Sequence, residues 1–304
     1  DAVIVHEPSP ITQFYPALLL KKLQKVPVYF WVMDLWPESL EILGGVKNKF
    51  VLNLFTKMVT NFYENSEKIL ITSKGFKKSI LEKGNFKNKL EYFPNWAEDS
   101  ISQGDVNYPI PNLPEGFKVM FAGNVGEAQD MEAVMNSALY LKNHSKIKLI
   151  IVGDGRKMSF VQEFIQQNNL QETVITVGQF PLDAMASFFA KADMMLVSLR
   201  DDAIFNMTVP AKTQAYMSAS KPIIAMLNGE GAEIIEEANC GVSVPAGDSK
   251  KLAEIIVKMS ELDPEVLKNM GENSRNFFLE NYSLPSCIDN LERILKLKNS
   301  VDKM

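Results

Sequence analysis

The fold is decided by the stretch from Phe117 to Asp130, Phe-Lys-Val-Met-Phe-Ala-Gly-Asn-Val-Gly-Glu-Ala-Gln-Asp. Its apolar first half predicts a buried strand, and apolar residues at helical spacing after Asp130 predict a helix. Gly123 and Gly126 lie in the turn between them, where glycine lets a ligand approach the backbone. The start of the helix favours an anion such as a diphosphate. Two glycines alone indicate a ligand site no more strongly than a tight turn without a ligand.

Size and composition predict a two-domain soluble protein. The chain has 304 residues, of which 46% are hydrophobic and 23% charged. This length suits two domains, and no apolar run approaches the roughly 18 residues of a membrane span. The chain opens at Asp1 directly before a strand-like segment, so we expect its first domain to be truncated at the N-terminus. Cys240 and Cys287 fit neither a disulfide framework nor a metal motif, which favours a reducing cytoplasm.

Charge is distributed unevenly along the chain. Residues 1–97 contain 13 lysines and 9 acidic residues, a net charge of +4, although the whole chain carries −5. Lys47, Lys49 and Lys57 flank the apolar residues of a helix predicted from about Lys49 to Asn65. This helix either packs in a core with solvated lysines, which its wide apolar surface favours, or rests on an anionic membrane at the inner face. The chain has no concentrated basic stripe, so nucleic-acid binding is not expected.

Strand and helix signals alternate along the whole chain. Residues 1–97 predict part of an α/β domain, and residues 98–116 have the polar, proline-containing composition of a linker. Residues 117–284 predict six strands alternating with helices, which implies a doubly wound parallel sheet with right-handed crossovers. A last helix, residues 286–298, is predicted after Pro285. We expect it either to end the second domain or to pack back on the first domain.

Three further loops of the second domain follow strands. Gly153 and Arg156 belong to a glycine turn in which a guanidinium could pair with a phosphate. Gly178 and Gln179 belong to the next turn, which could read a nucleobase edge through backbone groups. The loop from Thr208 to Lys212 leads into a helix at Pro210 and leaves N–H groups free for an anion. Because the carboxyl ends of parallel strands meet at one sheet edge, these loops predict a site for a phosphate-bearing ligand.

Together these motifs resemble the family 4 glycosyltransferases, which have the GT-B fold of two Rossmann-like domains. The matching residues are Gly123-Asn124-Val125-Gly126 with Gln129, Val152-Gly153-Asp154-Gly155, Val177-Gly178, Val209-Pro210-Ala211-Lys212 with Tyr216-Met217, Gly241, and Pro94-Asn95. The segments Asp34-Leu35-Trp36-Pro37-Glu38-Ser39 and Thr208 to Gln214 look closest to the fucosamine transferases of bacterial capsule and O-antigen synthesis.

The resemblance implies retaining transfer of a sugar, without metal or cofactor, from a nucleotide-sugar to an acceptor. The implied donor is a UDP-N-acetyl-deoxysugar, the acceptor is a glycan or a lipid-linked saccharide, and the implied place is the cytoplasm. Catalytic candidates are His6 and Asp34 in the first domain. The donor-binding candidates are Gly123, Asn124, Gly126, Gly153, Arg156, Gly178, Gln179, Thr208, Val209, Lys212 and Gln214.

The chain departs from the family pattern at two places. Met207 and Ala215 stand where many members have glutamates, so Gln214 is the nearest polar side chain and the ribose-binding residue stays open. Glu127 stands near the position where relatives often have a cation. Two alternatives therefore remain: a non-catalytic nucleotide-sugar-binding protein, or a UDP-N-acetylglucosamine 2-epimerase, which the presence of only two histidines disfavours.

Overall fold

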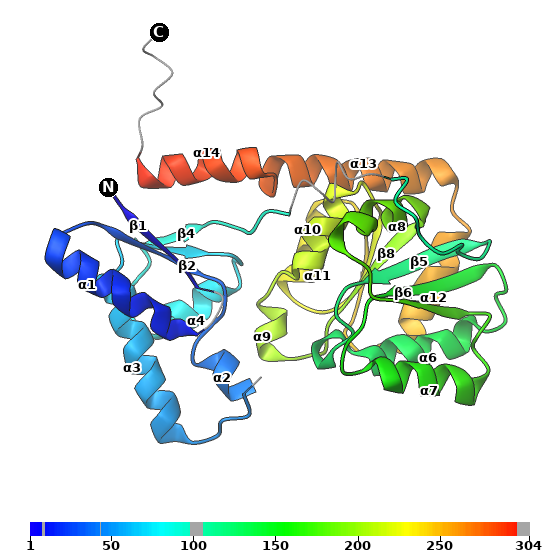
Figure 1. Ribbon diagram of the computed structural model, residues 1–304, viewed down its shortest axis with the longest axis horizontal. Coiled ribbons are helices and arrows are strands. Elements are labelled where there is room, and N and C mark those ends of the chain that lie inside the picture. Colours follow the sequence, from blue (N-terminus) through cyan, green and yellow to red (C-terminus); the bar gives the residue numbers. More distant parts are fainter. Residues whose placement is uncertain (8–9, 43, 98–105, 297–304) are drawn as a thin grey trace, which may run out of the picture. The chain divides into compact units, whose positions relative to one another are not determined.

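The computed structural model describes residues 1–7, 10–42, 44–97 and 106–296 (Figure 1). The chain divides into two compact units. The first contains Asp1–Asn95, Met207–Val209 and the residues from Cys287 onward, and the second contains Trp96–Asn206 and Pro210–Ser286.

The first unit is built on a four-stranded parallel sheet, ordered β1-β2-β3-β4. Burial of the central strand β2 on both faces explains why its sequence is continuously apolar. Aromatic rings fill the core, and the ring centroids of Phe14 and Phe62 are 4.6 Å apart. The elements are β1 (Val3–Glu7), the 3-10 helix η1 (Ile11–Phe14), α1 (Tyr15–Gln24), β2 (Val28–Val32), α2 (Glu38–Ile42), α3 (Lys49–Asn65), β3 (Lys68–Ile71), α4 (Phe76–Glu82) and β4 (Leu90–Tyr92).

The second unit is built on a six-stranded parallel sheet with helices on both faces (Figure 1). The strand order is β10-β9-β8-β5-β6-β7. The strands are β5 (Phe117–Ala122), β6 (Ile147–Val152), β7 (Val174–Gly178), β8 (Met194–Ser198), β9 (Ile223–Met226) and β10 (Gly241–Val244). The helices are η2 (Glu127–Gln129), α6 (Met131–Leu141), α7 (Met158–Asn168), η3 (Leu182–Ala184), α8 (Met185–Lys191), α9 (Ala203–Asn206), α10 (Ala211–Ser218), α11 (Glu230–Glu237), α12 (Ser249–Ser260) and α13 (Pro264–Asn281).

The last helix, α14 (Leu284–Leu295), begins earlier than its sequence predicts. Pro285 lies inside the first helical turn, which needs no N–H donor there, rather than before the helix. Within the first unit, the Asn290 Nδ2 atom donates a hydrogen bond of 3.2 Å to the carbonyl oxygen of Tyr92. Residues 297 and 298, the predicted end of the helix, lie outside the described residues. Among the helices that the structure describes, none has the length and apolar character needed to span a bilayer.

Candidate nucleotide-binding site

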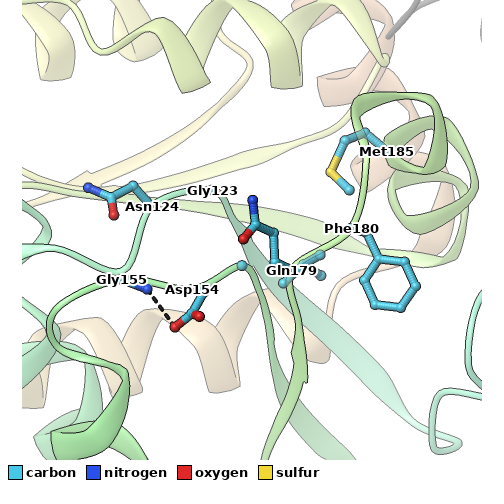
Figure 2. Close-up of a pocket in the computed structure, with 9 residues that line it drawn as sticks. Gly123, Asn124, Asp154, Gly155, Gln179, Phe180 and Met185 are labelled. Atoms are coloured by element: carbon cyan, nitrogen blue, oxygen red, sulfur yellow. Dashed lines mark hydrogen bonds between the residues drawn. The ribbon is translucent and has the colours of Figure 1, made fainter.

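A pocket of about 500 Å³ lies at the carboxyl end of the second unit's sheet. The chain's strand order reverses between β5 and β8, and ligands of open α/β sheets bind at such a switch point. The turns after β5 and β6 form one side of the pocket, and the segment after β7 forms the other (Figure 2). The lining residues are Gly123, Asn124, Val152, Gly153, Asp154, Gly155, Gln179, Phe180 and Met185.

Glycines allow the turns after β5 and β6 to pack directly against each other. Gly153 has φ of +139°, and a Cβ atom there would lie 2.0 Å from the carbonyl oxygen of Gly123. A Cβ atom on Gly155 would lie 2.4 Å from the carbonyl oxygen of Val125. Hydrogen bonds join the two turns, since the Val125 N–H donates to the carbonyl oxygen of Asp154 at 2.8 Å. The two glycine motifs therefore form one backbone surface.

The first turn offers fewer free N–H groups than its sequence suggests. The 3-10 helix η2, which the sequence did not predict, lies between the turn and α6, and Asp130 caps α6 at the predicted start of the long helix. The Gly126 N–H donates to the Gln129 Oε1 atom at 3.1 Å, and the Gly123 N–H donates to Val152. Asn124, which lines the pocket, is the turn residue whose N–H has no acceptor among the described residues.

The acidic residues after this turn have polar partners inside the second unit. Lys157 forms ion pairs with Glu127 at 3.2 Å and with Glu132 at 3.1 Å. The Asp130 carboxylate instead caps α6 by accepting the N–H of Ala133. One lysine therefore offsets part of the negative charge of these acids.

Lys212, in the first turn of α10, is the cation held nearest to the first glycine turn. Its Nζ atom lies 3.6 Å from the centroid of the Phe121 ring. A Cβ atom on Gly123 would lie 2.9 Å from the Lys212 Cε atom, so the lysine stem rests against the turn. The Nζ atom is buried and has no hydrogen-bond partner among the described residues. Burial lowers the pKa of Lys212 from its ordinary 10.5 to about 7.

The structure brings together only some of the predicted donor-binding residues. Gly123, Asn124, Gly153 and Gln179 line the pocket, and Lys212 reaches Gly123 from α10. The other predicted residues do not line the pocket. Gly126 and Gly178 stand next to lining residues, whereas Arg156 is exposed and Gln214 is buried on α10. Thr208 and Val209 belong to the segment counted with the first unit.

The sequence motifs missed part of the pocket lining. Met185 begins α8 and lies near Phe180 in Figure 2, opposite the polar groups of Asn124 and Asp154. The Phe180 ring packs edge-on against Phe188, with centroids 4.8 Å apart. A methionine at a helix start has the pattern of a core residue, so no sequence signal marked it. The pocket thus has a polar glycine side and an apolar side.

Tyr216 anchors the end of β5 beside the pocket. Its hydroxyl group donates to the carbonyl oxygen of Ala122 and accepts the Ala122 N–H, both at 2.9 Å. We expect Tyr216→Phe to lower the free energy of unfolding of the second unit by about 1–3 kcal/mol, because both backbone groups lose a buried partner. Urea unfolding measures this loss. Tyr140→Phe, at an exposed position on α6, is the matched control, and equal midpoints for the two variants would contradict the assignment.

In the first unit, the two predicted catalytic residues lie in different surroundings. His6 is exposed, and its ring lies tilted against that of Trp31, with ring centroids 4.8 Å apart. Asp34 follows β2 and is half-buried. Successive strand residues face opposite sides of a sheet, so Glu7 faces away from His6, and it is buried. The acid beside His6 was not among the candidates.

Comparisons with known proteins agree with this geometry. Residues 116–261 match the family model described as Glycosyl transferases group 1. WbjE of Pseudomonas aeruginosa, named a probable glycosyltransferase, is 29% identical over 283 residues, which cover 88% of this chain and 69% of that protein. WcaI of Escherichia coli K12, named for colanic acid biosynthesis and glycosyl transfer, is 27% identical over 193 residues, covering 59% of this chain and 46% of that protein.

A solved structure gives the fold. The crystal structure of Anabaena HepE in complex with UDP superposes with a TM-score of 0.75 at 13% identity, covering 94% of this chain and 76% of that one. The predicted GT-B fold is confirmed. Residues 116–261 resemble the glycosyl transferases group 1, and proteins similar to this chain include some named as glycosyltransferases or for polysaccharide biosynthesis.

Proposed function

We propose that this chain, whose residues 116–261 match the model of the glycosyl transferases group 1, transfers a sugar from a UDP-sugar to a saccharide or lipid-linked acceptor. The observation that carries the proposal is the buried ammonium group of Lys212, which lies against Gly123 without a hydrogen-bond partner among the described residues. A buried cation without a partner is costly unless an anion completes the site. A diphosphate supplies that charge.

The pocket suits the rest of a nucleotide. The Phe180 ring offers an apolar surface for a base, and the Gln179 side chain, exposed beside it, can read the base edge (Figure 2). The glycine turns admit the diphosphate close to the backbone, beside Lys212. Departure of the diphosphate needs positive charge, which Lys212 supplies in place of a metal ion. That HepE binds UDP supports UDP as the carrier.

The finer assignments follow from the resemblance to family 4. The reaction retains the anomeric configuration, the donor is a UDP-N-acetyl-deoxysugar, and the product belongs to capsule or O-antigen polysaccharide. The first unit contributes Asp34 to the acceptor site. The enzyme is thus of the hexosyl or N-acetylhexosaminyl type.

Incubation of the protein with a panel of UDP-sugars and lipid-linked or free saccharide acceptors tests this function. We expect a new glycosidic bond, detected by mass spectrometry, with the donor's anomeric configuration by NMR. UDP binding without turnover across the panel would support a non-catalytic binding protein. Release of an epimerised sugar without an acceptor would support a 2-epimerase.

The exposed half of α3 gives the enzyme a contact with an anionic membrane surface. Phe50 is 79% exposed and Leu54 is 59% exposed, and Lys47, Lys49 and Lys57 are exposed around them. The buried residues of this helix, Val59, Phe62 and Tyr63, all lie in its C-terminal half. Apolar tips flanked by lysines match the boundary between acyl chains and anionic headgroups.

Replacing Lys49 with glutamate and Phe50 with serine together should weaken binding to phosphatidylglycerol vesicles by about 10-fold or more, since each lysine near the surface contributes about 1 kcal/mol. Co-sedimentation measures the effect. Lys258→Glu, an exposed lysine of α12, is the control and should leave binding unchanged. Equal sedimentation of the chain with neutral phosphatidylcholine vesicles would refute the contact.

A further inference from the structure

Glu7 is a buried carboxyl group that the nucleotide site does not use. It ends β1, is 0% exposed, and neither carboxyl oxygen has a hydrogen-bond partner among the described residues. A buried carboxylate that lacks donors is strongly disfavoured relative to the neutral acid. The chain therefore retains an isolated acid inside the first unit, at the carboxyl end of its sheet.

The sheet register brings Glu7 close to Asp34 along the chain. Glu7 pairs with Val32, the last residue of β2, and Asp34 lies two residues farther on, in the bend that follows the strand. Burial, and then the charge of Asp34, raise the pKa of Glu7 to about 8. The N–H groups of Met33 and Asp34 and the indole of Trp36 offset this in part, without reaching hydrogen-bonding geometry.

The other groups around Glu7 do not supply a positive charge. Tyr63 faces it from α3, and burial, followed by the charges of Glu38 and Glu7, raises the pKa of this tyrosine well above its ordinary value. Glu38 itself is paired with Lys83 at 2.5 Å. Among the described residues, no lysine or arginine stabilises an ionised Glu7.

We propose that Glu7 is a positioning residue for Asp34: it carries its proton at neutral pH and points this donor at Asp34, the less buried of the two acids, whose carboxylate accepts a hydrogen bond from the hydroxyl group of the acceptor. When two neighbouring carboxyl groups share one proton, one of them stays neutral while the other is ionised. Hydrogen bonds of this kind are often long in ligand-free sites and shorten when the ligand binds. The acceptor's role rests on the proposed function, whereas the protonation of Glu7 does not.

Two substitutions of Glu7 distinguish the effect of a hydrogen-bond donor from the effect of side-chain volume. Glutamine keeps the volume and an N–H donor at every pH, and leucine keeps the volume alone. At neutral pH we expect Glu7→Gln to keep kcat/KM for the acceptor within about 3-fold and Glu7→Leu to lose about 10-fold or more. UDP affinity should stay unchanged in both. With the UDP-sugar saturating at every pH, so that loss of the Lys212 proton does not limit donor binding, wild-type kcat/KM for the acceptor should fall as the pH rises through about 8, and Glu7→Gln should lack this fall.

If Glu7 acted only through packing, or as an ionised carboxylate, the results would differ. Equal kcat/KM for Glu7→Gln and Glu7→Leu, or an alkaline fall shared by wild type and Glu7→Gln, would overturn the proposal. Where Glu7→Leu fails to fold, the alkaline profile of Glu7→Gln alone decides.

Protonation is also measured without any activity, which separates this inference from the proposed function. Infrared spectra at neutral pH should show a protonated carboxyl band in wild type that Glu7→Gln lacks. A pKa raised from 4.5 to about 8 means that the folded state binds the extra proton, so its stabilising effect is complete below 4.5 and is lost as the pH rises through about 8. Glu7→Gln should therefore be the more stable protein at alkaline pH. Spectra without the band would refute the proposal even if transfer occurs.

Discussion

Replacing Lys212 with methionine will weaken UDP binding by about 10- to 100-fold, because a charge-assisted hydrogen bond contributes roughly 1.5–3 kcal/mol. The same change will stabilise the ligand-free second unit. In the free protein the Nζ atom is buried without a partner among the described residues, and methionine keeps the packing against Phe121 without the charge. Titration calorimetry and urea unfolding measure the two effects, which have opposite signs.

Arg156→Met is the matched control for this prediction. Sequence analysis places both cations at the phosphates, but Arg156 is exposed to solvent, where charge interactions are screened. We expect Arg156→Met to weaken UDP binding by less than about 1 kcal/mol and to leave stability unchanged. Equal losses of affinity for the two variants would show that burial does not make Lys212 contribute more to UDP binding than Arg156 does.

The pH dependence gives a second test of Lys212. Its pKa is lowered from 10.5 to about 7, so above neutral pH the free protein loses the proton that UDP requires. We expect wild-type affinity for UDP to fall by up to about 10-fold per pH unit above this pKa, and the Lys212→Met variant to show no such fall. The unfolded chain binds this proton up to about pH 10.5, so the stability of the ligand-free unit should rise with pH between about 7 and 10.5.

Gly153→Ala will destabilise the second unit by about 3–5 kcal/mol and abolish UDP binding, since it combines backbone strain with an overpacked contact. The added Cβ atom would lie 2.0 Å from the carbonyl oxygen of Gly123, which is fixed backbone and cannot rotate away. Relief of the clash must separate the two glycine turns that form the polar side of the pocket. Urea unfolding and calorimetry with UDP measure both losses.

Gly178→Ala is the control for positive φ alone. Gly178 has φ of +82°, but a Cβ atom there would have no neighbour within 4 Å. Alanine at such a position costs about 1–2 kcal/mol from the left-handed backbone. If the two glycine variants lose the same stability, then packing between the turns does not explain the need for Gly153.

Sequence patterns were sufficient for the fold because they are local. Strands such as Phe117–Ala122 are continuously apolar because both faces of a parallel sheet are covered, and each glycine turn directly follows its strand. Alternation of strand and helix then dictates parallel pairing. The doubly wound parallel sheet follows from these patterns, as do Gly123, Asn124, Gly153 and Gln179 as residues at one sheet edge that line one pocket, whereas the GT-B fold was implied by the resemblance to family 4.

Whether a charged side chain is buried, and which partner it has, could not be predicted from these local patterns. Arg156 and Lys212 look alike in sequence, and only packing against Phe121 and Gly123 buries one of them. Glu127 stands near a position where the resemblance leads to the expectation of a cation, and only the structure shows that Lys157, from the start of the next helix, pairs with it.

The sequence by itself determined which segments become strands and which turns meet at the sheet edge, because periodicity and glycine act within a few residues. Tertiary structure alone decided that Glu7 is buried while His6 lies against Trp31, and that the Gly126 N–H is already used by Gln129. These outcomes depend on sheet register and on loops meeting in space. Burial and the distance between charges, which set a side chain's protonation, exist only once the chain has folded.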